Sequence, residues 1–234
     1  MSNLIKLYKP DYRKIQRLNP VLYLDRKYSA FDVVRGNNTG QWDDLSGNNY
    51  HATQGTATDK PILSPEAVEF DGLNDYMLYN DSVRYNSDDI WSIYVEFDAS
   101  AADGIFYNSR GSGGNKQGFI FTYTGTKLQF TFREQIITNT VKGKEYTVNL
   151  SGKNKIVGTY DGSEAASGFK LYLNGIEVGS SRDDGAWSST GILSRKQPSI
   201  CAVEAENNYF ETVVSTIAIF EKELTSVEAI SLSS

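Results

Sequence analysis

Short runs in which apolar and polar residues alternate recur through most of the chain, and they predict β-strands. The clearest run, DIWSIYVEFDAS, covers residues 89–100. One face of it would carry Trp91, Ile93, Val95 and Phe97, and the other would carry Ser92, Glu96 and Asp98. A period of two residues is typical of a strand with one buried and one solvated face. We therefore expect a half-buried strand here.

Turn residues separate the alternating runs. Residues 118–134 (GFIFTYTGTKLQFTFRE) predict a hairpin that turns at 124–126, and residues 168–181 (GFKLYLNGIEVGSS) predict one with Asn174 and Gly175 at its tip. Asn-Gly between apolar runs favours a tight hairpin because both residues tolerate a positive φ. Further strands are predicted over 21–25, 67–72, 74–79, 154–162 and 209–224.

One short helix is predicted at the C-terminal end. Thr225 and Glu228 have the spacing of a capping box, and they precede the apolar residues Ala229, Ile230 and Leu232. Many short strands joined by turns, with one terminal helix, predict an all-β fold with two antiparallel sheets packed as a sandwich.

Residues 1–20 are expected to form an N-terminal arm, separate from one domain over 21–234. Residues 1–28 hold seven basic and two acidic side chains, although the chain as a whole has a net charge of −6. Large apolar groups between the basic ones suggest that the arm docks onto a surface. The candidate docking residues are Leu4, Ile5, Tyr8, Tyr12, Arg13, Lys14 and Arg17. The surface belongs either to another protein or to this sandwich, along which the arm would fold as an extra edge strand.

Composition excludes several classes of partner. The acidic body argues against nucleic-acid binding, which needs clustered lysine and arginine. No apolar run approaches the roughly 18 residues of a membrane span, and the first residues are too polar for a secretory signal. We therefore expect no membrane insertion, and synthesis in a cytoplasm. The single cysteine, Cys201, cannot form an intramolecular disulfide and is expected to be buried.

The run QWDDLSGNNYHATQG, residues 41–55, holds the only histidine beside aspartates, a serine and a tryptophan. Asp44, Ser46, Asn48 and Asn49 are residue types whose side chains bond to the backbone of their own turn. His51 has no second ligand motif near it and no nucleophile signature. We interpret this run as a structural connection, with Trp42 and Leu45 packed beneath it.

Several segments, taken in order, resemble the concanavalin A-like, or laminin-G-like, jelly-roll superfamily. They are VLYLD, WDDLSGNNYHATQ, AVEFDGLNDYM, WSIYVEFDAS, IVGTYDG, FKLYLNGIEVGS and STIAIFEKELTSVEAISL, within residues 21–232. The chain is most similar to the branch found in phage virion proteins and bacterial surface proteins. The resemblance implies a two-sheet jelly roll over residues 21–234, with residues 1–20 outside it.

The same superfamily contains retaining glucanases, whose Glu-x-Asp-x-Glu motif supplies two catalytic glutamates. Here Glu96 and Asp98 match the first two acids, but Ser100 stands in place of the second glutamate. Glu204 and Glu206 have suitable spacing without a central aspartate. A retaining mechanism needs two carboxyl groups about 5 Å apart. No catalytic residues are predicted.

Two further sites are candidates. The segment SSRDDGAWSS is one residue shorter than the aspartate box of sialidases, and its Trp187 could stack on a sugar ring. Asp161, Asp183 and Asp184 are candidate oxygen ligands for calcium, which some laminin-G-like relatives bind. The sequence has no EF-hand spacing, so our expectation is that no cofactor is needed, with calcium as the alternative.

These observations lead to one functional hypothesis and two alternatives. The hypothesis is a non-enzymatic structural or binding protein of a phage particle: a head decoration, a head fibre or a tail-associated component. Located in the virion, it would bind other virion proteins through its arm, and its jelly roll would contact glycans or a host surface. The alternatives are a bacterial carbohydrate-binding module or adhesin domain, and a divergent glycoside hydrolase. No oligomeric state is predicted.

Overall fold

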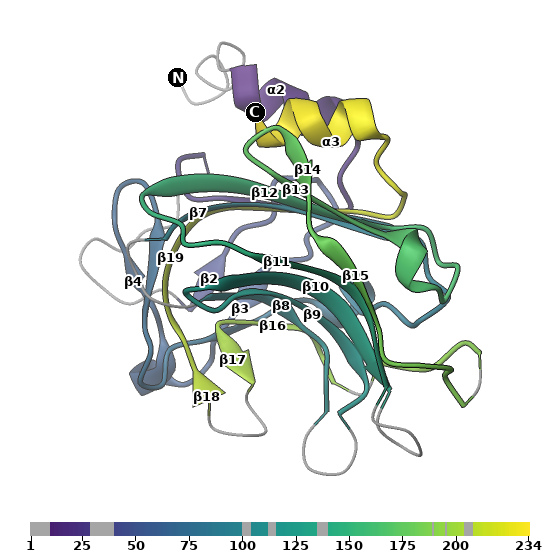
Figure 1. The fold of residues 1–234 in the computed structure, drawn as a ribbon. Coiled ribbons are helices and arrows are strands. Elements are labelled where there is room, and N and C mark those ends of the chain that lie inside the picture. Colours follow the sequence, from purple (N-terminus) through teal and green to yellow (C-terminus); the bar gives the residue numbers. More distant parts are fainter. Residues whose placement is uncertain are drawn as a thin grey trace.

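The computed structural model describes residues 10–28, 40–99, 104–111, 116–134, 140–188, 190–194, 196–203 and 208–234. Within these residues two antiparallel sheets pack face to face, and two α-helices lie on the outer side of one of them (Figure 1). This arrangement confirms the predicted all-β, two-sheet jelly-roll sandwich.

Each sheet combines pairs of strands that are consecutive in sequence with pairs that are distant in sequence. The first sheet has the order β14 (Ile176–Val178), β13 (Phe169–Leu173), β12 (Lys153–Tyr160), β7 (Trp91–Asp98), β19 (Glu211–Phe220), β5 (Val68–Asp71) and β4 (Ile62–Leu63), and β1 (Leu22–Asp25) also pairs with β19. The second sheet has the order β15 (Ser180–Asp183), β11 (Thr140–Thr147), β10 (Lys127–Glu134), β9 (Gly118–Tyr123), β8 (Gly104–Asn108), β16 (Ser199–Ile200), β6 (Met77–Leu78), β3 (Ala52–Thr53) and β2 (Gln41–Trp42). The short strands β17 (Ala202–Val203) and β18 (Asn208–Tyr209) form a separate pair.

Helical structure is limited in the described residues. The α-helices are α2 (Pro10–Arg17) and α3 (Ser226–Ser233), and single 3₁₀ turns occur at η2 (Ala57–Asp59), η3 (Asp81–Val83) and η4 (Ala166–Gly168). The predicted capping box of α3 is present, since Thr225 Oγ1 accepts a hydrogen bond from the backbone of Glu228 and Glu228 accepts one from the backbone of Thr225.

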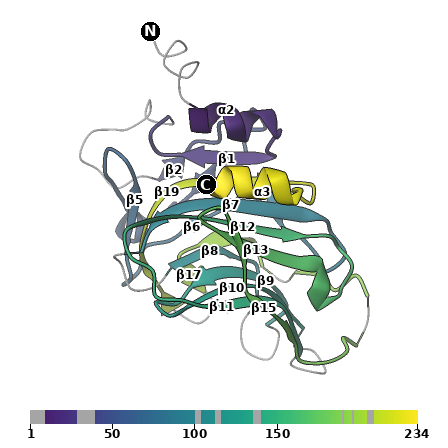
Figure 2. The ribbon, with the colours of Figure 1, turned by 45° about the horizontal axis from the view of Figure 1, so that its top comes forward.

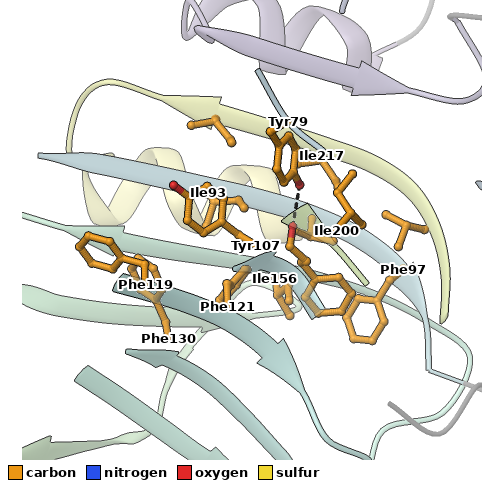
Figure 3. Packing of buried hydrophobic residues seen from close by; sticks show 14 of the residues in the cluster. Tyr79, Ile93, Phe97, Tyr107, Phe119, Phe121, Phe130, Ile156, Ile200 and Ile217 are labelled. Carbon is orange, nitrogen blue, oxygen red and sulfur yellow. Dashed lines mark hydrogen bonds between the residues drawn. The ribbon is translucent and has the colours of Figure 1, made fainter. Parts of the chain in front are cut away.

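Aromatic side chains fill the space between the sheets. The ring of Trp91 lies 4.7 Å from that of Tyr85 and 5.1 Å from that of Phe119, measured between centroids. Figure 3 shows Phe119 and Phe130 packed in the same core. Each large aromatic ring removes about 150–250 Å² from water, so this cluster supplies much of the hydrophobic stabilisation.

The outer face of β7 is covered, which differs from the prediction. Trp91 and its alternate residues point into the core as expected, but Ser92 and Tyr94 on the opposite face are also buried. The reason is a second apolar cluster, in which α2 and α3 lie over the first sheet (Figure 2). It comprises Ile15, Tyr23, Tyr94, Val157, Tyr172, Ala218, Phe220, Leu224, Ala229 and Leu232. A strand expected to be half-buried is therefore buried on both sides.

The described part of the N-terminal arm folds back on its own sandwich as a helix, not as the edge strand considered from the sequence. Ile15 is only 2% exposed and belongs to the second cluster, and Tyr12 and Leu18 pack against it. Lys14 Nζ donates to the backbone oxygen of Ser231 in α3, at 3.3 Å. The candidate docking residues Leu4, Ile5 and Tyr8 lie outside the described residues. An eight-residue helix is marginal in isolation, so tertiary packing stabilises it here.

The two predicted hairpins are confirmed. Thr124 N donates to the backbone oxygen of Lys127, which closes the turn between β9 and β10. Asn174 and Gly175 have φ values of 47° and 83°, the left-handed conformations that a tight hairpin turn requires. Cys201 is fully buried, as expected. In the part of the chain that the structure describes, no helix is long and apolar enough to cross a membrane.

Candidate binding site

The carboxylate of Asp44 organises the loop between β2 and β3. Its Oδ1 accepts hydrogen bonds from the backbone nitrogens of Tyr23 and Ser46, both at 2.9 Å. Its Oδ2 accepts from Ser46 Oγ at 2.7 Å and from Tyr50 N at 2.9 Å. Asp44 therefore satisfies the backbone of its own loop, as expected, and also binds that loop to β1.

His51 takes part in the same connection. Its Nδ1 accepts a hydrogen bond from the backbone nitrogen of Asp44 at 3.0 Å, and lies 3.6 Å from Asp43 Oδ1. Trp42 is buried in the core and Leu45 packs against the second apolar cluster. These contacts agree with the structural interpretation of residues 41–55.

Beside this loop lies an open cleft of about 700 Å³, which we call the polar cleft. It is lined by Arg17, Leu18, Asn19, Pro20, Val21, Ser46, Asn48, Tyr50, Glu221 and Lys222. Three distant segments meet there: the end of α2 with the start of β1, the Asp44 loop, and the link between β19 and α3. Its volume falls within the range of roughly 300–1,000 Å³ typical of ligand clefts.

Hydrogen bonds hold two of these walls together. Ser46 Oγ and Asn48 Nδ2 both donate to the backbone oxygen of Val21, at 3.1 Å and 2.8 Å. Asn19 adopts a φ of 55°, which turns the chain sharply between α2 and the buried Pro20. The relation between the Asp44 loop and the end of α2 is therefore set by specific bonds and a fixed turn.

The lining combines one aromatic ring with amide and charged groups. Tyr50 is half-buried, whereas Asn19, Asn48 and Glu221 are exposed. Amides both donate and accept hydrogen bonds, and a carboxylate accepts them. An aromatic ring offers an apolar surface between such groups. This combination matches a ligand that has many hydroxyl groups and an apolar ring face.

Charged and polar groups of this lining also act on a buried hydroxyl of the core. Tyr85 is 5% exposed, and its hydroxyl has no hydrogen-bond partner among the described residues. Burial raises the pKa of Tyr85, Tyr107 raises it further, and Glu221, Asp89 and Tyr50 add smaller contributions in the same direction. Glu221 and Tyr50 belong to the cleft, so this unsatisfied hydroxyl sits in the same electrostatic environment.

Sequence reasoning missed this cleft as a site. The notable signal was the amide-rich string SGNNY, residues 46–50, which we interpreted as a turn only. Asn48 and Tyr50 do stabilise the turn, but their side chains also line the cleft. Asn19 and Glu221 carry no sequence signal, because only the fold brings them to this loop.

Trp187, the predicted sugar-stacking residue, is not among the residues lining the polar cleft. Its ring lies 5.2 Å from that of Phe132 at the end of β10, and Lys142 Nζ lies over the ring at 5.1 Å from the centroid. Its indole nitrogen is buried without a partner among the described residues. Core packing and a cation–π contact therefore account for much of its surface, and its role in ligand binding stays a prediction.

The candidate calcium ligands bind protein groups. Asp161 accepts a hydrogen bond from Ser163 N at 2.9 Å, and Asp183 accepts one from Gly185 N at 3.1 Å. Asp184 pairs with Arg182, whose Nη2 lies 2.8 Å from its Oδ2. In the described residues, no group of three or more histidine, cysteine or acidic side chains is placed to hold a metal ion.

The arm residues divide between the two faces of α2. Tyr12 packs its ring 5.6 Å from Tyr23, and Lys14 reaches α3. Arg13 and Arg17 are exposed on the other side of the helix. Of these candidate docking residues, Arg17 lines the polar cleft.

A second, smaller cavity of about 170 Å³ lies beneath α2, where Ile15, Asp25, Tyr94 and Glu96 are among the lining residues. Burial raises the pKa of Asp25 from an ordinary value of 3.8 to about 6; the hydrogen bond from the Tyr23 hydroxyl opposes this shift and the charge of Glu96 adds to it. Glu96 accepts a hydrogen bond from the Tyr94 hydroxyl at 3.3 Å. Ser100, Glu204 and Glu206 lie outside the described residues.

Comparisons with known proteins identify the family of the sequence and solved structures that share its fold. The family described as the Concanavalin A-like lectin/glucanases superfamily matches residues 71–229. No curated protein sequence matches the chain.

Several solved structures share the fold at low sequence identity. The binding domain of Paraclostridial Mosquitocidal Protein 1 is similar over 93% of this chain and 52% of its own, with 14% identity and a TM-score of 0.61. The botulinum neurotoxin serotype G binding domain is similar over 92% and 50%, with 15% identity and a TM-score of 0.59. A Trypanosoma rangeli sialidase is similar over 98% and 39%, with 11% identity and a TM-score of 0.56. The chain thus spans between two fifths and about half of these structures.

The Asp44 carboxylate provides a test of how the cleft wall is held. We expect Asp44→Asn to lower the free energy of unfolding by about 1.5–3 kcal/mol, because the new amide faces backbone donors with a donor of its own. The matched control is Asp43→Asn, whose carboxylate bonds to the exposed Gln41 side chain. Urea unfolding monitored by tryptophan fluorescence measures both, and equal midpoints for the two variants would contradict the role assigned to Asp44.

The pKa of Asp25 predicts a pH dependence of stability. Between about pH 4 and pH 6 the folded state keeps a proton on Asp25 that the unfolded state has released, so the free energy of unfolding falls as the pH rises. Two pKa units correspond to about 3 kcal/mol, present below pH 4 and lost above pH 6. Asp25→Asn removes this loss, so its stability relative to the wild type should increase from pH 4 to pH 7.

Urea unfolding at several pH values measures this difference. Because Asp75 also has a pKa raised to about 6, the wild type and the variant share its contribution, which cancels in the comparison. Parallel stability profiles for the two proteins would show that Asp25 does not titrate in this window.

Proposed function

Because the chain belongs to the concanavalin A-like lectin/glucanase superfamily, we propose that it is a non-enzymatic binding protein of a phage particle whose polar cleft holds a glycan of the host surface. The observation that carries the proposal is the cleft itself. Tyr50 stands among Asn19, Asn48 and Glu221, on walls held by specific hydrogen bonds. A pyranose has one apolar face and a rim of hydroxyl groups, which match an aromatic ring flanked by amides and a carboxylate.

The similar structures support binding as the role. Two of them are binding domains of toxins, and the fold similarity extends over more than nine tenths of this chain. The proposed binding uses side chains of the protein alone and needs neither a metal nor another cofactor.

The placement of the acidic residues supports a non-enzymatic role. Glu96 and Asp98 lie on the outer face of β7, opposite the core residue Phe97, and Glu96 belongs to the small cavity beneath α2. The glucanase motif lacks its second glutamate at Ser100. A hydrolase would need a second carboxyl group about 5 Å from the first on opposite sides of a bound sugar.

Attachment to the particle would use the N-terminal segment. Arg13 is exposed on α2, and the residues before it include Lys6 and Lys9. These basic residues would bind acidic surfaces of other virion proteins, in a head decoration, a head fibre or a tail-associated component. The protein would then work in the virion, with the polar cleft available to the host.

Substitution of Tyr50 tests glycan binding. We expect Tyr50→Ala to weaken binding on a glycan array about tenfold, because loss of one stacking contact costs about 1.4 kcal/mol. The control Tyr76→Ala removes a half-buried tyrosine that does not line the cleft, and should bind as the wild type does. Trp187→Ala distinguishes the two candidate sites: if it abolishes binding while Tyr50→Ala does not, the cleft is not the site.

Co-sedimentation tests attachment to the particle. Deletion of residues 1–20 would remove Ile15 and uncover the second apolar cluster, so it would test folding as well as attachment. We therefore expect the full-length variant with Lys6, Lys9 and Arg13 all changed to Glu to lose co-sedimentation with phage particles while its melting temperature is unchanged. Undiminished co-sedimentation of this variant would contradict attachment through the arm.

A further inference from the structure

Arg17 is an exposed cation at the wall of the polar cleft. It is the last residue of α2, it is exposed, and the described residues provide no hydrogen-bond or ion-pair partner for its guanidinium group. The other cation of the cleft, Lys222, is bound, with its Nζ 2.9 Å from Glu228 Oε1. The two cations therefore differ in what they offer a ligand.

Another arginine on the surface, Arg182, shows what a guanidinium group can bind in this protein. Its guanidinium group pairs with two carboxylates: Nη1 lies 2.8 Å from Glu145 Oε1, and Nη2 lies 2.8 Å from Asp184 Oδ2. A guanidinium group holds carboxylates through two parallel hydrogen bonds, a geometry that lysine cannot reproduce. Arg17 has the same five donors, and no carboxylate among the described residues pairs with them.

The charged groups around the cleft would orient a bound ligand. Glu221 is exposed on the segment that links β19 to α3, and has no ion-pair partner in the described part of the chain. A ligand with an anionic group is attracted to Arg17 and repelled by Glu221, whereas hydroxyl groups can donate to Glu221. Asn19 and Asn48 also line the cleft, and their amides can donate hydrogen bonds to a polar ligand or accept them from it.

We propose that the polar cleft selects an acidic glycan, whose sugar carboxylate is bound by Arg17 while the ring packs on Tyr50. This inference rests on the proposed function and adds the chemical class of the ligand. Sulfate or phosphate esters share the negative charge, but the planar carboxylate is the group whose two oxygens match the fork of one guanidinium. Arg17 reaches the cleft because it is the last residue of α2.

The test uses the full chain and an array of matched glycans, each present with its carboxyl group intact, with that group reduced to an alcohol, and with a sulfate ester in its place. We expect the wild type to bind the carboxylated form about tenfold more tightly than the reduced form. Arg17→Gln should bind both forms at the level of the reduced one. Arg17→Lys should retain a preference for the anionic forms without distinguishing carboxylate from sulfate, since an ammonium group is a point charge.

Arg13→Gln is the matched control, because it removes the same charge from the same helix one turn earlier and does not line the cleft. On the glycan array it should bind as the wild type does, because the role proposed for Arg13 in attachment to the particle does not enter this assay. The outcomes separate the two proposals. Equal wild-type binding of carboxylated and reduced glycans, lost in Tyr50→Ala, would overturn the acidic ligand and leave glycan binding intact. Absence of glycan binding by the wild type would overturn the proposed function itself.

A preference for sulfate over carboxylate in the wild type would also overturn the assignment of the carboxylate, although the anionic character of the site would remain. Loss of discrimination in Arg13→Gln equal to that in Arg17→Gln would attribute the effect to the general charge of α2 and would contradict a specific role for Arg17.

Discussion

The hydrogen bonds of the Asp44 carboxylate connect the loop of residues 41–55 to the first strand of the sandwich. One oxygen accepts from the backbone of Tyr23 in β1, and both oxygens accept from the loop that contains Ser46 and Tyr50. A buried carboxylate is stable only when such donors replace its water shell. The position of Tyr50 and Asn48 at the cleft therefore depends on this group together with the bonds from Ser46 and Asn48 to the backbone oxygen of Val21. Asp44 acts as a structural anchor, as its residue type predicted.

A second constraint comes from the outer face of the first sheet, which carries Tyr94, Tyr172 and Phe220. These apolar side chains are removed from water by α2 and α3, which pack over them (Figure 2). Burying Ile15 orders a helix too short to be stable alone. The same packing places Arg17 and Asn19 beside the Asp44 loop, so covering the sheet and completing the polar cleft are consequences of one arrangement. The N-terminal segment is thus part of the candidate site as well as the proposed means of attachment.

The sequence predicted those elements of the fold that depend on residues close together in the chain. The alternation around Trp91, the Asn174–Gly175 turn and the capping box at Thr225 each depend on residues close in sequence, and each is present. The helical state of residues 10–17 was not predictable in this way, because a helix of eight residues is marginal in isolation and its apolar contacts come from α3 and β1. The polar cleft was missed for a related reason. Its three segments lie far apart in the chain, and Asn19 and Glu221 become neighbours of Tyr50 only after folding.

The sugar-stacking assignment of Trp187 stays a prediction, and it competes with a packing role for the same ring. A tryptophan in a polar loop suggests a ligand, yet this ring contacts Phe132 and lies beneath Lys142. Mapping of the bound glycan by backbone amide chemical shifts tests the choice of site most directly. With the glycan that binds best in the array, we expect the largest shifts at Asn19, Ser46, Asn48 and Tyr50. Shifts confined to Trp187 and its neighbours, with none around the Asp44 loop, would contradict the account.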